Sequence, residues 1–326
     1  MSFKPAFGLG NPHVQTLFAS LFRKDLHLAI EVERFILDDG DFVEAHWHNK
    51  PQTNTTKPIV ILFHGLNGSF KSPYIQGVMK ECARANFSAV VMHFRGCSGV
   101  ENNTARAYHS GDSSDARSWI NYVSKKYTNA KLFGVGYSLG GNMLLKLVGE
   151  DGDSTPLSGV VSVSAPLQLD DSAHRVQKGF SKFYQYILLN DLNKALKKKF
   201  KKYDMAQYIS LKEEKVEDLK TFWDFDGAYT APMHGFQSAQ DYYTKCSAKQ
   251  FLKQVSIPTL IIHALDDPFM TPAVLPLEEE LSTRVKLEVS KFGGHVGFVA
   301  GSVLKPQYWL DKKVVNSLKK LCYNEK

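Results

Sequence analysis

Long uncharged apolar segments are missing from this sequence. Nowhere do about 18 uncharged apolar residues follow one another, which is the length that a membrane-spanning helix needs. The first residues, MSFKPAFGLGNPHVQT, contain no long apolar run behind a basic start, so we expect no signal peptide. The four cysteines (Cys82, Cys97, Cys246 and Cys322) form no CxxC pair and have no regular spacing. They are expected to be free thiols in a reducing compartment, for which the cytoplasm is the default.

Cofactor motifs are also missing. The sequence contains no metal-ligand cluster and no glycine-rich nucleotide loop, so we expect no cofactor and no metal. The formal net charge is +7, but the one dense basic run is confined to a short stretch, Lys194–Lys202, and no nucleic-acid recognition motif accompanies it. That stretch indicates a solvated helix face or, alternatively, weak contact with an anionic membrane. No stable protein partner is expected.

What is present is an alternation of short β-branched runs with amphipathic stretches, which is typical of an α/β fold. Residues 28–37 and 41–48 are expected to form an antiparallel hairpin, because Asp38-Asp39-Gly40 between them is a strong turn signal. Six further runs are expected to be strands, and the central ones are apolar on both faces, as strands of a buried parallel sheet are. The six runs cover residues 58–63, 88–94, 131–137, 159–164, 258–263 and 285–290.

Residues 167–256 interrupt this alternation. They contain no convincing strand, and from Phe183 to Tyr203 apolar residues recur at helical spacing. The sequence therefore predicts a mostly parallel sheet with a helical cap inserted between two of its strands. In domain terms, residues 1–166 and 257–326 would form the core, and residues 167–256 the cap.

A candidate nucleophile lies in Gly136-Tyr-Ser138-Leu-Gly140, which matches the G-x-S-x-G pattern. Such a match is weak by itself, but here a predicted strand precedes it and a predicted helix follows it. That context produces a sharp turn that lifts the serine hydroxyl above the sheet edge. Small residues on both sides of the serine allow the backbone segments to approach closely. The N-terminus of the new helix would also favour a developing negative charge.

A serine nucleophile needs a histidine base and a carboxylate that orients it, and in this kind of fold they follow in the order serine, acid, histidine. His295, within Phe292-Gly-Gly-His295, follows the last predicted strand and is the only one of eleven histidines in the required place. Asp266 and Asp267 both follow the preceding strand. We expect Asp266 to be the acid, with Asp267 as the alternative.

Backbone N–H groups are expected to form an oxyanion hole. One would come from Leu139, directly after the serine, and the other from Leu66, in the loop after the strand 58–63. His64 would touch the site or, as we prefer, hold this loop by hydrogen bonds. Arg95 and the stretch Tyr108–Asp112 are expected to have structural roles, with Arg95 pairing locally and Asp112 or Ser113 capping a helix.

Together these motifs resemble the YheT-type esterases of bacteria, a group in the α/β-hydrolase superfamily that is similar to eukaryotic α/β-hydrolase-domain lipases and esterases. The resemblance covers essentially the whole chain. It rests on the motifs Asn11–Thr16, His64–Ser69, His93–Gly99, Tyr108–Asp112, Gly136–Met143, Asp241–Tyr243, Asp266–Phe269 and Gly293–Phe298. The resemblance implies an α/β-hydrolase fold and a triad at Ser138, Asp266 and His295.

The expected function is hydrolysis of short- to medium-chain carboxylic esters or lipids through an acyl-serine intermediate. Two alternatives remain open. Acyl transfer would use the same site with an acceptor other than water, and a non-catalytic binding protein could retain the fold. The presence of nucleophile, base and acid together argues against the second alternative.

Overall fold

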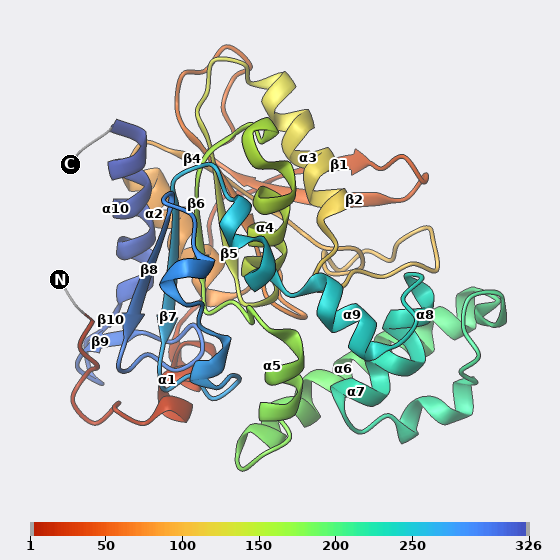
Figure 1. The fold of residues 1–326 in the computed structure, drawn as a ribbon. Coiled ribbons are helices and arrows are strands. Elements are labelled where there is room, and N and C mark those ends of the chain that lie inside the picture. Colours follow the sequence, from red (N-terminus) through yellow and green to blue (C-terminus); the bar gives the residue numbers. More distant parts are fainter. Residues whose placement is uncertain (1–2, 324–326) are drawn as a thin grey trace.

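An eight-stranded sheet forms the centre of the computed structural model, which describes residues 3–323 (Figure 1). Its strand order is β1-β2-β4-β3-β5-β6-β7-β8. β1 and β2 form an antiparallel hairpin, β2 pairs antiparallel with β4, and all the other pairs are parallel. The strands are β1 (Glu31–Ile36), β2 (Phe42–His48), β3 (Ile59–Phe63), β4 (Ser88–Met92), β5 (Leu132–Tyr137), β6 (Leu157–Val163), β7 (Thr259–Ala264) and β8 (Val285–Ser290).

These strands confirm the predicted α/β architecture, with its antiparallel start and mostly parallel sheet. The central strands β3, β4 and β5 are buried along their whole length, which explains why their sequences are apolar on both faces. A separate small hairpin, β9 (Val299–Gly301) and β10 (Pro306–Tyr308), follows the last strand of the main sheet.

Helices cover both faces of the sheet. On one face, α2 (Pro73–Arg84) and α10 (Trp309–Tyr323) bury Ile75, Val78 and Leu318 against the strands. On the other face, α3 (Ser113–Lys126) and α4 (Leu139–Asp151) bury Trp119 and Leu144 in a second apolar layer. Figure 1 shows these two pairs of helices on opposite sides of the sheet. α1 (Pro12–Phe22) precedes the sheet and packs near β9.

The segment between β6 and β7 is helical, as predicted. It contains α5 (Leu169–Arg175), α6 (Ser181–Lys202), α7 (Phe222–Phe225), a π-helical turn (Asp226–Thr230), α8 (Ala231–Met233), α9 (Ala239–Cys246) and short 3₁₀ turns at Met205–Gln207, Glu213–Asp218 and Ala248–Gln254. Part of this segment has its own apolar core, which includes Leu189, Leu196 and Val216. The division of the chain into a core and a cap at residues 167 and 256 stays a prediction.

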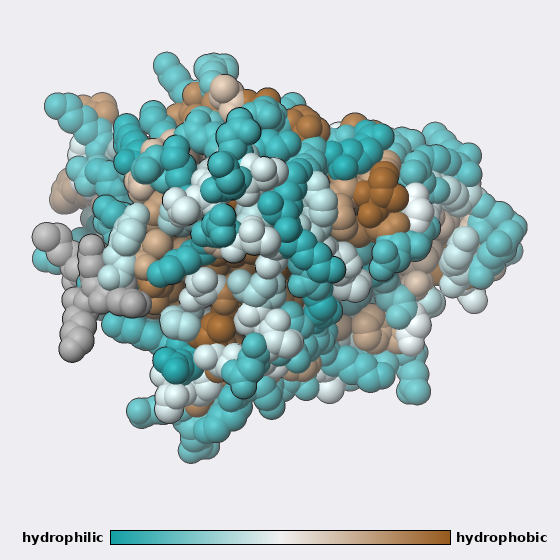
Figure 2. Space-filling model, turned by 90° about the horizontal axis from the view of Figure 1, so that it is seen from above, coloured by the Kyte–Doolittle hydropathy of each residue, from teal (hydrophilic) through white to brown (hydrophobic). Residues whose placement is uncertain are grey.

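Polar side chains dominate the face of the molecule seen from above in Figure 1. On this face, drawn in Figure 2, hydrophobic residues appear only as small separate patches among hydrophilic ones. Within residues 3–323, no helix is both long enough and apolar enough to cross a membrane. All four cysteines are free thiols.

Candidate active site

Ser138 occupies the sharp turn between β5 and α4. Its backbone angles are φ 50° and ψ −121°, a region that residues with a side chain rarely adopt. The strained turn is held by its surroundings, because the N–H of Ser138 donates to the carbonyl of Val163 on the neighbouring strand at 2.9 Å. The serine hydroxyl is therefore presented at the carboxyl edge of the sheet, where ligands of α/β proteins bind.

The two glycines of the motif are required by close backbone contacts. A Cβ at Gly136 would collide with the carbonyl of Gly140, and a Cβ at Gly140 would lie 2.5 Å from the carbonyl oxygen of His64. Both obstacles are backbone atoms, which cannot rotate away. The spacing of the glycines around Ser138 thus reflects the packing of the turn against the loop after β3.

His295 connects the serine to a carboxylate. Its Nε2 lies 2.9 Å from Oγ of Ser138, and its Nδ1 lies 2.8 Å from Oδ2 of Asp267. With the ring proton on Nδ1, His295 donates to Asp267 and accepts the serine hydroxyl proton, which is the connectivity of a serine–histidine–aspartate triad. Residues 138, 267 and 295 come from three separate loops at the same edge of the sheet.

The structure brings Asp267, the alternative, and not the expected Asp266 into contact with the histidine. β7 continues to Ala264, so Leu265 and Asp266 form the turn after the strand, and the two neighbouring carboxylates point in different directions. Asp266 accepts the N–H of Gly294 at 2.9 Å, whereas Asp267 accepts from Phe269 N–H at 2.8 Å and faces the histidine ring. Burial raises the pKa of Asp266. Asp266 thus stabilises the histidine loop, and Asp267 contacts the histidine.

α1 holds the loop that carries His295, a role that we did not predict from the sequence. The hydroxyl of Thr16 accepts the N–H of His295 at 2.9 Å. The fully buried Gln15 binds both backbone groups of Val299 through its amide, at 2.7 and 3.1 Å. Both residues lie in the motif Asn11–Thr16, which carried family resemblance but suggested no role of its own. Partners 279 and 284 residues apart leave no local signal in the sequence.

An aromatic stack covers the histidine. The ring of Phe269 lies parallel to that of His295 with centroids 4.2 Å apart, and it also stacks on Tyr184 of α6 at 4.9 Å. These contacts restrict the rotation of the imidazole about its side-chain bonds. They also connect the triad directly to the helical segment between β6 and β7.

The loop after β3 leaves one backbone donor free beside Ser138. The N–H of Gly65 donates to the hydroxyl of Tyr74 and that of Asn67 to the hydroxyl of Tyr108, both at 3.0 Å. Within residues 3–323, the N–H of Leu66 between them has no hydrogen-bond partner, and neither has that of Leu139. Leu66, Leu139 and Ser138 line the same cavity. Both N–H groups of the predicted oxyanion hole are thus without a hydrogen-bond partner in the described part of the chain, and their residues line the cavity at Ser138.

His64 fixes this loop by hydrogen bonds, in agreement with the role that we preferred. Its Nδ1 contacts the carbonyl of Gly65 at 2.7 Å, and its Nε2 accepts the N–H of Phe94 at 3.2 Å. The side chain is fully buried, and burial lowers its pKa to about 4. The ring therefore stays neutral at physiological pH, with the proton on Nδ1, and acts as a structural link between two loops.

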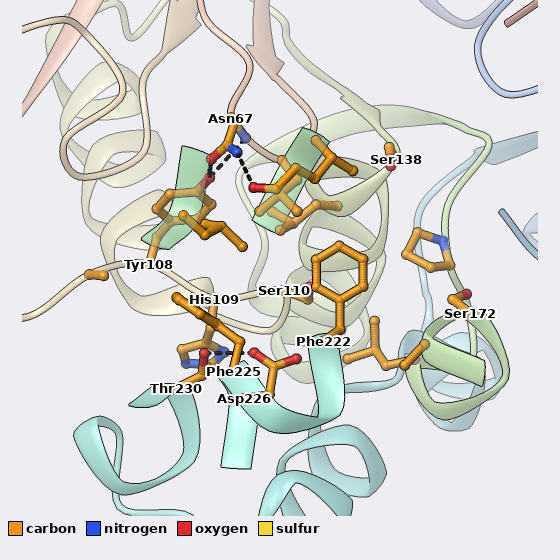
Figure 3. Close-up of a pocket in the computed structure, with 18 of the residues that line it drawn as sticks. Asn67, Tyr108, His109, Ser110, Ser138, Ser172, Phe222, Phe225, Asp226 and Thr230 are labelled. Atoms are coloured by element: carbon orange, nitrogen blue, oxygen red, sulfur yellow. Dashed lines mark hydrogen bonds between the residues drawn. The ribbon is translucent and has the colours of Figure 1, made fainter. Parts of the chain in front are cut away.

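A cavity of about 240 Å³ extends from Ser138 into the helical segment. Its walls are mostly apolar and come from α5, α6 and α7, through residues such as Leu169, Leu192, Ala195 and Phe222. Figure 3 shows Ser138 at one side of the cavity and Asp226 and Thr230 at the opposite side. A substrate chain that starts at the serine would therefore lie among apolar side chains and end near polar ones.

Asp226 and Lys199 are two of the ionisable residues that line the cavity. Asp226, in the π-helical turn, accepts hydrogen bonds from Thr230 at 2.6 Å and Tyr243 at 2.7 Å, and burial raises its pKa to about 6. Lys199 of α6 donates to the carbonyls of Thr104 and Arg106, and burial lowers its pKa to about 8. Both groups are thus held by hydrogen bonds to other parts of the protein.

His109, Asp112 and His234 offer ligand atoms within 4.8 Å of one another. A metal would need a bare nitrogen on each histidine. However, Nδ1 of His109 already accepts the N–H of Gly111 at 3.2 Å, which places the proton of the neutral ring on Nε2. Oδ1 of Asp112 is bound by Arg106 at 2.7 Å. These contacts occupy one nitrogen of His109 and one oxygen of Asp112, whereas Oδ2 of Asp112 and Nε2 of His234 have no hydrogen-bond partner within residues 3–323.

The structure also revises the expected roles of two basic groups. Arg95 does not pair locally but binds Asp115 and Asp39, both at 2.6 Å, and lies 3.2 Å from Asp41. In the stretch Lys194–Lys202, Lys199 points into the cavity and Lys197 pairs with Glu217. The end of α6 is thus partly neutralised and partly turned inward, which weakens its interpretation as a membrane contact.

Comparisons with known proteins agree with this geometry. Residues 58–302 match the family model described as the alpha/beta hydrolase fold. The chain is 41% identical, over 96% of its length and 91% of the relative's, to YheT of Escherichia coli (strain K12), which is named as a candidate esterase. It is 27% identical to human phospholipase ABHD3, over 84% of this chain and 68% of that protein. Esterase Pf2001 of Pyrococcus furiosus has a similar solved structure, with a TM-score of 0.58, 14% identity, and coverage of 92% of this chain and 93% of that one.

Proposed function

Because the chain belongs to the α/β-hydrolase family, we propose that it is a serine esterase that cleaves carboxylic esters through an acyl-serine intermediate. The observation that carries the proposal is the unbroken chain of contacts from Ser138 through His295 to Asp267. Relatives named as an esterase and a phospholipase support ester substrates.

In the first half of the reaction, Oγ of Ser138 attacks the ester carbonyl carbon while its proton passes to Nε2 of His295. Asp267 accepts the hydrogen bond from Nδ1–H of His295 and stabilises the imidazolium that forms. The carbonyl oxygen becomes an oxyanion that the N–H groups of Leu66 and Leu139 bind. When the tetrahedral intermediate collapses, the alcohol leaves with the proton from His295, and the acyl group stays on Ser138.

In the second half, water replaces the alcohol. His295 takes a proton from the water as its oxygen attacks the acyl carbon, and the same two N–H groups bind the new oxyanion. Collapse breaks the bond to Ser138, returns the proton to Oγ and releases the carboxylic acid. Each group is thus restored to its starting state without any cofactor.

We further propose that the acyl chain of the substrate is short to medium and occupies the apolar cavity beside Ser138. The mostly apolar walls contributed by α5, α6 and α7 suit a hydrocarbon chain, since burying each CH₂ group contributes about 0.8 kcal/mol. Residues 167–256 would act in this account as a cap over the serine. The four free cysteines support our proposal that the protein works in a reducing compartment, the cytoplasm.

A chain-length series of p-nitrophenyl esters tests the proposal. The wild-type protein should hydrolyse esters of short and medium chain length, and Ser138→Ala should reduce kcat by several orders of magnitude without loss of folded protein. Circular dichroism and thermal unfolding of the variant give the folding control. If Ser138→Ala hydrolyses the esters as fast as wild type, the observed activity belongs to another site.

A further inference from the structure

Exposed apolar side chains gather where α1 and the start of α6 meet. Phe183, Tyr186 and Ile187 of α6 have exposed fractions of 47%, 69% and 41%. Val14 and Leu21, one helical repeat of seven residues apart on α1, are exposed as well. We name these five residues together with Phe180 the apolar rim.

Aromatic contacts join the two parts of the apolar rim. The ring of Phe180 lies 4.7 Å from that of His13 in α1 and 5.6 Å from that of Phe183 in α6. Nδ1 of His13 also lies 3.1 Å from the hydroxyl of Tyr184. In Figure 1, α1 and the turn that leads from α5 into α6 both lie on the lower side of the molecule. This is the side opposite the mainly hydrophilic face in Figure 2.

The two segments that carry the apolar rim contain basic residues and no acidic ones. Residues 3–24 contain Lys4, Arg23 and Lys24 but no aspartate or glutamate, and of these Arg23 is paired with Asp311. Residues 172–190 contain Arg175, Lys178 and Lys182, again without an acidic residue. Lys178 and Lys182, which flank Phe180 in the sequence, are both exposed. Aromatic and aliphatic side chains combined with basic ones are the pattern of surfaces that bind anionic lipid.

A second cavity, of about 190 Å³, connects this region with the triad. Thr16, Ala19 and Ser20 of α1 form one wall, and Leu188 of α6, the residue next to Ile187, forms part of another. Ser138 and His295 line the same cavity. Residues next to the apolar rim on α1 and α6 thus line the same cavity as Ser138, and we call this cavity the passage to the serine hydroxyl.

We propose that the apolar rim docks this protein onto the surface of an anionic phospholipid bilayer. Phe180, Phe183, Tyr186 and Ile187 enter the region between headgroups and acyl chains, while Lys178 and Lys182 bind lipid phosphate. Docking itself does not need the reaction. The role of the passage in this docking rests on the proposed esterase function. With the rim on the bilayer, a lipid ester of the membrane would be the substrate that reaches Ser138.

Sedimentation with lipid vesicles tests the docking surface. Wild-type protein and Ser138→Ala should both bind vesicles of phosphatidylglycerol mixed with phosphatidylcholine, and the triple variant Phe183→Ser/Tyr186→Ser/Ile187→Ser should bind at least about tenfold more weakly. Its kcat/KM on p-nitrophenyl butyrate should stay within about twofold of wild type, since none of these residues lines a cavity at Ser138. The matched control Val32→Ser/Ile36→Ser/Leu277→Ser removes apolar residues with exposed fractions of 57%, 60% and 61% elsewhere on the surface and should bind as wild type does.

A second pair of variants tests the basic residues. Lys178→Gln/Lys182→Gln should weaken binding to anionic vesicles several-fold, and high salt should remove that difference. Lys194→Gln/Lys201→Gln, at the opposite end of α6, should leave binding unchanged. The proposal is overturned if wild-type protein does not bind the vesicles or if the apolar-rim variant binds them as tightly as wild type. It is also overturned if the only effect of the apolar-rim variant is to abolish association between copies of this chain, because the rim would then be a protein–protein interface. Vesicle binding without hydrolysis of the soluble ester would leave docking intact and refute the esterase proposal instead.

Discussion

Nδ1 of His295 lies 2.8 Å from Oδ2 of Asp267, and only 4% of Asp267 is exposed. A buried carboxylate at this distance holds the imidazole in one tautomer and one orientation, with Nε2 directed at Ser138. The other oxygen of Asp267 accepts the N–H of Phe269, so the carboxylate is fixed at both ends. In the proposed reaction, Asp267 is therefore the group that orients His295 toward the serine.

Asp267→Asn should therefore reduce kcat for p-nitrophenyl esters by about a thousandfold to ten-thousandfold, because an amide nitrogen facing Nδ1 would favour the wrong tautomer. The matched control is Asp266→Asn, which keeps an oxygen to accept the N–H of Gly294 and should cost less than about tenfold. Steady-state kinetics of the two variants decide the assignment. A larger loss with Asp266→Asn would reverse it.

The choice between these two carboxylates shows where the sequence stops being informative. The strand before them and the order serine, acid, histidine could be predicted, because hydrophobic runs and motif context are local features. Which of Asp266 and Asp267 faces His295 depends on how the turn after Ala264 closes, and adjacent side chains there point in different directions.

The polar contacts that hold the site from distant parts of the chain could not be predicted from the sequence either. The buried strands β3 to β7 were predicted within a few residues because continuous apolar runs are characteristic of parallel strands. Gln15 and Thr16, in contrast, act on residues almost a whole chain away, and Arg95 binds Asp39 and Asp115 instead of a local partner. Polar contacts of this kind follow from the tertiary structure and leave no periodic pattern.

Buried charge pairing at Arg95 should make a large contribution to stability. Arg95→Met would leave Asp41 and Asp115 buried without their cation, and we expect the free energy of unfolding to fall by about 3–5 kcal/mol. Lys215→Met is the control, since both side chains of the Lys215–Asp218 pair are about two-thirds exposed and the pair should contribute about 1 kcal/mol or less. Urea unfolding of both variants measures the difference. Equal losses of unfolding free energy in the two variants would contradict the expected contribution of the buried Arg95 contacts.

His64 should make stability depend on pH. Its pKa falls from 6.5 in the unfolded chain to about 4 in the folded one, so below pH 6.5 the unfolded state binds more protons. The stabilisation is complete above pH 6.5 and is lost as the pH falls toward 4. In His64→Gln, the loss of unfolding free energy between pH 7.5 and pH 5 should be smaller than in wild type by about 2 kcal/mol. His27→Gln, at an exposed position, should change nothing, and an unaltered pH dependence in His64→Gln would refute the assignment.

The apolar cavity should set the acyl-chain preference. Ala195→Phe adds a ring to the wall of the cavity and should lower kcat/KM for octanoate esters at least about tenfold while leaving acetate esters within about threefold. Asn190→Phe, on the exposed side of α6, controls for an added ring outside the cavity. A parallel decline for both esters in Ala195→Phe would indicate damage to the fold rather than a shorter cavity.

Covalent labelling of Ser138 tests the central claim most directly. Wild-type protein incubated with a fluorophosphonate probe should gain the mass of one phosphonyl group, and peptide mapping should place it on Ser138. Ser138→Ala should not react, and Asp267→Asn should react far more slowly than Asp266→Asn. Absence of labelling in folded wild-type protein, or modification at another residue, would contradict the account.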